Sequence, residues 1–282
     1  MGRTFPTSVA ALILLEDLQD VGRVRPLPLI LLIHRFQALL DMGATTETTQ
    51  WVRLAGENHD GSIEQFEVVA ARRALALLKG NLGRDRLLEL LQDEIAAGNA
   101  FLREHVARSG GHETTGTTRL LAHGITAAHF AGWLAQAFGR EDVLLAGHPE
   151  HYSIHAAGGR VNIVETLGEH VCSFFMREWD ESATPAAELP TPDDDATHGR
   201  RSRLVLEDGT IVGSITNSFS KEEDGFTARL SVTLPATCGP QVIEHHLQHF
   251  AVEFRNWILR AAAEQSGRSK PSPETPMNAG PP

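Results

Sequence analysis

Apolar positions in the first half of the chain recur at the three- and four-residue intervals that are typical of amphipathic helices. This repeat predicts helices over residues 63–78 and 84–107, with Asn81-Leu82-Gly83 as the turn between them. The Gly- and Thr-rich stretch 107–119 lacks the repeat, and we interpret it as a loop and as a domain boundary. Residues 1–110 are therefore expected to form a mostly α-helical region.

The pattern changes after this loop. Thr126 is a suitable N-cap for an amphipathic helix that ends near Phe138. Stretches such as RVNIVETLG and FTARLSVTLPA then alternate apolar and polar residues, which predicts strands, and Asp208-Gly209 predicts a hairpin turn. The last predicted element is a long helix between Pro240 and Ala263.

These elements define the rest of the predicted organisation. Residues 111–265 form one domain, in which the Pro-rich, acidic stretch 182–201 is a surface loop. Residues 266–282 form a disordered tail. Several strands followed by one long helix predict an α+β fold, with the helix against a curved antiparallel sheet.

Such a fold often leaves a cavity between the sheet and the helix, and a polar side chain that points into it needs a hydrogen-bonding or charged partner. Val161, Ile163 and Glu165 alternate along one strand and share a face. If the two apolar side chains point inward, so does the carboxylate, and a buried carboxylate without a partner is costly.

The C-terminal helix carries a cluster of histidines in the stretch EHHLQHFAVEF. His245, His249 and Glu253 are four residues apart, so they lie on one side of a helix. A His and a carboxylate one turn apart can hold one cation, although such a pair also occurs on surface helices that bind nothing. His246 is expected to face solvent.

A second cluster lies in the stretch GHPEHYSIH, which we interpret as a Pro-containing connection ahead of the first strand. It contains His148, His151 and His155. A loop histidine, Glu165 and the helix pair could meet at one end of the cavity. Four such nitrogen and oxygen ligands predict a site for a divalent metal ion, without selecting zinc over manganese, iron or nickel.

The order of these motifs resembles a known family. GITAAHFAGW, then HPEHY, NIVETLG and an H-x-x-x-E pair near the C-terminus look like the diacetylphloroglucinol hydrolase family, which includes phloretin hydrolase. The resemblance covers roughly residues 120–260. It implies a Bet v 1-like helix-grip domain behind a helical N-terminal region. It also implies hydrolysis of a carbon–carbon bond next to an aryl ketone by a metal-bound water.

The resemblance also implies roles for individual residues. The Zn²⁺ or other divalent ion would be held by His151, Glu165, His249 and Glu253, with His148 as the alternative loop ligand. For such a reaction, His148, His245 or His155 could donate the proton to the leaving carbon, since histidine titrates near neutral pH. Tyr152, or Asn217 and Ser218 on a hairpin strand, could hydrogen-bond the substrate or the oxyanion. The sequence departs from the family where its aromatic residues before the HP turn are replaced by Leu144, Leu145 and Gly147. An aromatic substrate is therefore less firmly implied than metal binding.

Composition narrows the class of partner. A net charge of −11 argues against nucleic acid. The apolar runs near the N-terminus are too short to span a membrane. The two cysteines, Cys172 and Cys238, fit a reducing cytoplasm. A small molecule is the expected partner, and the helical half is long enough to support a homodimer.

Two other functions are compatible with the same sequence. One is a metal-free helix-grip protein that binds a hydrophobic small molecule without catalysis. The other is an interaction module whose N-terminal helices mediate assembly.

Overall fold

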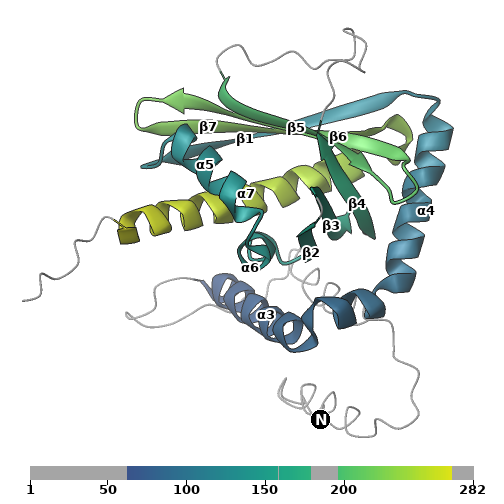
Figure 1. Cartoon of the computed structure of the whole chain (residues 1–282), viewed down its shortest axis with the longest axis horizontal. Coiled ribbons are helices and arrows are strands. Elements are labelled where there is room, and N and C mark those ends of the chain that lie inside the picture. Colours follow the sequence, from purple (N-terminus) through teal and green to yellow (C-terminus); the bar gives the residue numbers. More distant parts are fainter. Residues whose placement is uncertain (1–61, 158, 179–195, 269–282) are drawn as a thin grey trace, which may run out of the picture. The chain divides into compact units, whose positions relative to one another are not determined.

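The computed structural model describes residues 62–157, 159–178 and 196–268, all of which belong to one compact unit (Figure 1). The first part of the predicted helical region, most of the predicted surface loop and the tail beyond residue 268 lie outside the described residues.

A seven-stranded antiparallel sheet with the order β1-β7-β6-β5-β4-β3-β2 forms the body of this unit. Its strands are β1 Glu113–His123, β2 His151–Ala157, β3 Arg160–Leu167, β4 His170–Glu178, β5 Ala196–Val205, β6 Ile211–Glu222 and β7 Gly225–Pro235. The sheet curves around the long helix α7, Pro240–Arg268, which follows the 3₁₀ turn η3, Ala236–Cys238 (Figure 1). The predicted α+β helix-grip fold is confirmed.

Four more helices complete the described structure: α3 Ile63–Leu90, α4 Gln92–Ser109, α5 Ala127–Ala137 and α6 Glu141–Leu145. The predicted N-cap of α5 is present, because the Thr126 hydroxyl accepts a hydrogen bond from the His129 backbone N–H at 3.2 Å. Gly83 interrupts α3 where a turn was predicted, with φ of 69°. The predicted second helix is itself divided at Leu91, and α6 was not predicted.

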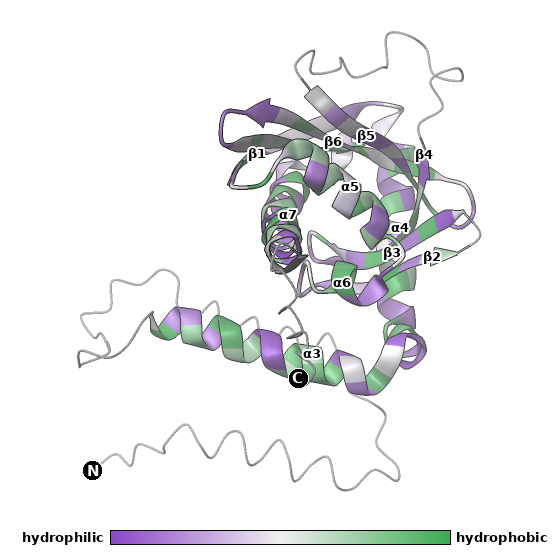
Figure 2. Ribbon diagram, turned by 60° about the vertical axis from the view of Figure 1, so that its left-hand side comes forward, coloured by the Kyte–Doolittle hydropathy of each residue, from purple (hydrophilic) through white to green (hydrophobic). Residues whose placement is uncertain are grey.

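The core lies between the concave face of the sheet, α5 and α7. Phe130 of α5 packs against Phe219, Phe226 and Phe254, with ring centroids 5.1 to 6.2 Å apart. Figure 2 shows α5 inside the curve of the sheet and α7 beside it. None of the described helices is long and apolar enough to cross a bilayer.

The predicted loop at 107–119 is wrong at both ends, because residues 107–109 belong to α4 and the residues from Glu113 onward form the edge strand β1. Threonine favours strands, and its hydroxyls pair across to β7: Thr115 with Thr233 at 2.8 Å, and Thr117 with a serine at 2.9 Å. Gly116 is needed for packing rather than for flexibility. A Cβ there would collide with Ile243 of α7.

Two further stretches predicted as loops are strands. Residues 196–201, expected in the surface loop, belong to β5 and pair with β6. HYSIH, expected in a connection, forms most of β2. In both cases these residues pair with the next strand along the chain, and this pairing supplies backbone hydrogen bonds that the apolar pattern of the stretch itself does not indicate.

Candidate functional site

The four residues assigned to the metal come from three elements that meet at one point. His151 opens β2 and is the cross-strand partner of Glu165 on β3. His249 and Glu253 lie one turn apart on α7. All four side chains are buried, with exposed fractions between 0% and 7%.

Their ligand atoms lie close together. Nε2 of His151 is 2.9 Å from Nε2 of His249, 3.6 Å from Oε2 of Glu165 and 3.7 Å from Oε1 of Glu253. Nε2 of His249 is also 3.6 Å from Oε2 of Glu165. The structure therefore brings together two imidazoles and two carboxyl groups without any lysine or arginine among them.

The tautomers of the two imidazoles leave a polar atom without a partner. Nδ1 of His151 lies 3.1 Å from the Leu144 carbonyl oxygen, which can only accept, so Nδ1 carries the proton. Nε2 of a neutral His151 is then a lone pair directed at His249. If His249 carries its proton on Nε2, its buried Nδ1 has no hydrogen-bond partner; if it carries it on Nδ1, two lone pairs face each other. A cation that accepted both Nε2 lone pairs would remove the repulsion between them and would place the His249 proton on Nδ1, which has no partner among the described residues.

Burial also disfavours charge on these residues. It lowers the pKa of His151 to about 3 and that of His249 well below its usual value. It raises the pKa of Glu165 to about 8 and that of Glu253 well above its usual value. A divalent cation would hold both carboxylates ionised and both imidazoles neutral, which is the form in which they bind metal. The residues present therefore fit a divalent ion.

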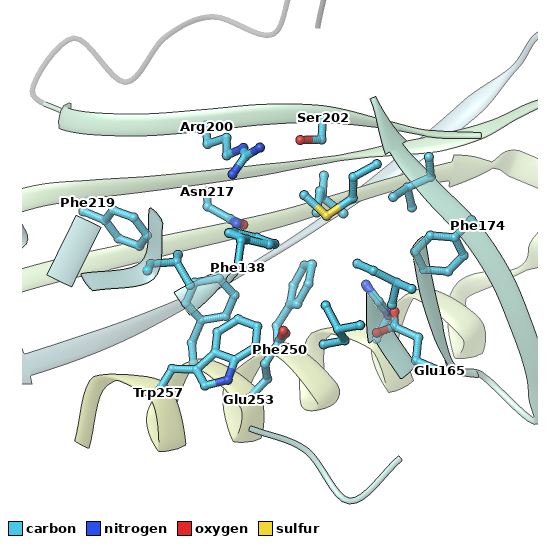
Figure 3. A pocket seen from close by; sticks show the side chains of 18 residues that line it. Phe138, Glu165, Phe174, Arg200, Ser202, Asn217, Phe219, Phe250, Glu253 and Trp257 are labelled. Atoms are coloured by element: carbon cyan, nitrogen blue, oxygen red, sulfur yellow. Dashed lines mark ion pairs between the residues drawn. The ribbon is translucent and has the colours of Figure 1, made fainter. Parts of the chain in front are cut away.

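A cavity adjoins this cluster between the sheet, α5 and α7 (Figure 3). Glu165, Glu253 and His246 contribute its polar side at the cluster, and Arg200, Ser202 and Asn217 contribute polar groups from β5 and β6. The rest of the lining is apolar and largely aromatic: Phe138, Phe174, Phe219, Phe250, Phe254, Trp257, Leu134, Leu204, Ile154, Ile163, Ile215 and Met176.

His246 lines this cavity, and the expectation that it faces solvent is wrong. Its side chain is 2% exposed, and both ring nitrogens lack hydrogen-bond partners. The physical reason is the helical rotation of about 100° per residue. Relative to Glu253, His246 is displaced by about 20°, whereas His245 is displaced by about 80° and is exposed on α7.

The other sequence-predicted residues take different positions. His148 stacks on His249 with ring centroids 3.8 Å apart, and its Nδ1 accepts a hydrogen bond from the Glu150 backbone N–H. Neutral His148 therefore carries its proton on Nε2. With Glu150 and His249 it forms a second group of close ligand atoms, which shares His249 with the first.

Tyr152 and His155 do not line the cavity. The Tyr152 hydroxyl lies 3.2 Å from Thr166 Oγ1, and burial raises the tyrosine pKa to about 12. Nδ1 of His155 lies 3.4 Å from a carboxylate oxygen of Glu141 on α6. Of the two hairpin-strand residues considered, Asn217 lines the cavity, while Ser218 follows it and so points to the other face of β6.

Lys79 of α3 supports the turn that leads into His151, a contact that sequence reasoning missed. Its Nζ donates to the His151 carbonyl oxygen at 2.6 Å and also to the carbonyl of Pro149. Burial lowers the pKa of Lys79 to about 8. The only sequence signal for this contact is a lysine on the packed face of an amphipathic helix, which is too common to identify a role.

Comparisons with known proteins give solved structures of similar fold. Ara h 8.0201 is 11% identical, with a TM-score of 0.37, and covers 54% of this chain and 99% of its own. A START superfamily protein from Mycobacterium smegmatis is 12% identical, with a TM-score of 0.35, and covers 53% and 99%. The Zhui aromatase/cyclase from Streptomyces sp. R1128 is 13% identical, with a TM-score of 0.30, and covers 56% and 96%.

No family model matches the sequence, and a search of curated proteins finds no match. The three solved structures share the fold of this chain and little of its sequence.

Proposed function

We propose that the protein binds a small, largely apolar carbonyl compound beside a divalent metal ion and hydrolyses the carbon–carbon bond next to the carbonyl. One observation carries the metal site: two buried imidazoles lie between two buried carboxyl groups, with their Nε2 atoms 2.9 Å apart and an oxygen of each carboxyl within 3.7 Å of His151 Nε2. The choice of a carbon–carbon bond comes from the resemblance to the diacetylphloroglucinol hydrolase family.

A divalent ion held by His151, Glu165, His249 and Glu253 would supply activation of water and polarisation of the carbonyl. The apolar wall, with Phe250 among its rings, would bind the body of the substrate and exclude bulk water. The proton transfer that this reaction requires would fall to histidines of the chain.

Two neutral histidines are placed to handle protons. The leaving carbon must take up a proton, and the ring nitrogens of His246 on the cavity wall have no hydrogen-bond partner among the described residues, although Nδ1 lies 3.9 Å from Oε1 of Glu165. His148 carries its proton on Nε2 and stacks against His249; it is the second candidate donor, at the cluster and outside the cavity lining.

Non-catalytic binding of a hydrophobic small molecule is the second candidate function. The observation that favours it is the lining of the cavity, which is apolar over most of its surface. This function needs no metal, and it requires the buried carboxyl groups to remain protonated.

Product analysis distinguishes the two functions. Metal-loaded protein is incubated with acyl-phenols and 1,3-diketones, and release of the carboxylic acid is followed by NMR. We expect release by the wild type and a loss of at least about 100-fold in Glu253→Gln, since changing even residues that only support metal ligands costs 10- to 100-fold. His245→Ala, on the exposed side of α7, is the control and should stay within about twofold. Binding of the ketones without release by the metal-loaded wild type would contradict the hydrolase and favour the carrier.

A further inference from the structure

Across the cavity from Glu253, the sheet presents a pair of polar side chains (Figure 3). Arg200 of β5 and Asn217 of β6 are direct cross-strand partners, so their side chains leave the sheet on the same face. Both line the cavity, in which most other side chains on the sheet are apolar. The two ends of the cavity therefore differ in chemistry: carboxyl groups and imidazoles at one, a guanidinium and an amide at the other.

The Asn217 amide needs a partner that the described chain does not supply. Its Oδ1 is buried without a hydrogen bond. The oxygen and nitrogen of an amide differ only by the network around them, so a rotation about χ2 can direct the NH₂ group to the same position. A ligand atom in the cavity would satisfy this group.

Arg200 is a cation without an acidic partner among the described residues. Its guanidinium lies 5.0 Å from the ring centroid of Phe138, which is a cation–π contact that leaves its N–H groups available. Arg200 is exposed and is the only lysine or arginine in the described lining, so it stands at the rim of the cavity.

We propose that the ligand is an amphipathic acid, whose carboxylate or similar oxyanion binds to Arg200 and Asn217 while its apolar body occupies the cavity. A guanidinium and an amide NH₂ together present the planar set of donors that suits an oxyanion. Arg200 is the only lysine or arginine in the described lining, so the oxyanion is expected at this end of the cavity, and this fixes the orientation of the ligand. This inference rests on the small-molecule binding proposed above and adds the class of molecule.

Two fluorescent probes with the same aromatic body test it. 1-Anilinonaphthalene-8-sulfonate carries an anion, and N-phenyl-1-naphthylamine is its neutral counterpart. Their dissociation constants are measured by fluorescence titration for the wild type, Arg200→Gln and Arg201→Gln. Arg201 is the matched control, because the adjacent residue of a strand points to the opposite face while the change in net charge is the same.

We expect Arg200→Gln to weaken binding of the sulfonate about tenfold and binding of the neutral probe less than twofold, since one charge-assisted contact is lost. Arg200→Lys should recover part of the affinity for the sulfonate. Equal weakening of both probes, no weakening of either, or an equal effect of Arg201→Gln would overturn the inference. Failure of both probes to bind the wild type would instead count against the proposed small-molecule cavity itself.

Discussion

At the scale of single residues, the backbone carbonyl of Leu144 determines the chemistry of the cluster. It accepts hydrogen bonds from Nδ1 of His151 at 3.1 Å and from Nε1 of Trp257 at 3.2 Å. The first contact fixes the tautomer of His151 and directs its Nε2 lone pair at the other ligand atoms. Such a contact is characteristic of metal-binding histidines, whose second nitrogen usually donates to a carbonyl or carboxylate.

Glu264 provides a residue-scale test of pH dependence far from the cluster. Hydrogen bonds from Arg260 and Trp133 lower its pKa from 4.5 to about 2, with Arg140 also contributing. Because the folded pKa is depressed, this contribution to stability is present above pH 4.5 and is lost as the pH falls towards 2. We expect Glu264→Gln to lower the free energy of unfolding by about 0.5–1 kcal/mol at pH 7.

That difference should shrink as the pH falls from 4.5 to about 2, because the wild-type carboxylate then becomes protonated. Urea unfolding of both proteins across this range measures it. A difference that does not change with pH would show that the glutamate acts through packing and not through its charge.

At the scale of elements, α4 lies so close to β4 that only a glycine fits between them. A Cβ on Gly98 would collide with the Val171 carbonyl and approach Cys172 Sγ at 3.1 Å. The Ser173 backbone N–H also donates to Asn99 of α4 at 3.0 Å. The N-terminal helices are thus packed onto the strand next to the one that carries Glu165.

Gly98→Ala is therefore expected to destabilise the fold by about 1–3 kcal/mol, as for other overpacked positions. Gly132→Ala on α5 is the matched control, because a methyl group there would meet no atom of another element within 4 Å and alanine favours a helix. It should stabilise by about 0.5–1 kcal/mol. Thermal unfolding of both variants checks the pair, and equal effects of the two substitutions would contradict the close approach of α4.

At the scale of the whole molecule, periodicity predicted the helices, the long α7 and the class of fold, because helical and strand repeats are local. It missed β1, whose pairing partner β7 lies about a hundred residues away in the sequence. It also missed the first part of β5 and most of β2, which pair with the next strand along the chain but lack a clear alternation of apolar and polar residues. The candidate ligands His249 and Glu253 follow from helical spacing. The prediction that these two residues lie beside His151 and Glu165 rested on the resemblance to the family as well as on the sequence pattern.

The remaining errors at the site have a geometric cause. A spacing of four residues suggested that His245 shares the helix face of Glu253. Each four-residue step rotates the position by about 40°, however, so two steps place His245 about 80° away, while His246 stays on the face. The Arg200–Asn217 pair could not be found from the sequence, since it depends on the register between β5 and β6.

The metal content of the purified protein tests the central claim most directly. Inductively coupled plasma mass spectrometry is applied after dialysis to the wild type, to the His249→Ala, Glu253→Gln double variant and to His245→Ala. The account predicts about one divalent ion per chain in the wild type and in His245→Ala, and its loss from the double variant while that variant remains folded. Absence of metal from the wild type, even after incubation with zinc, would contradict the account and leave a metal-free binding cavity.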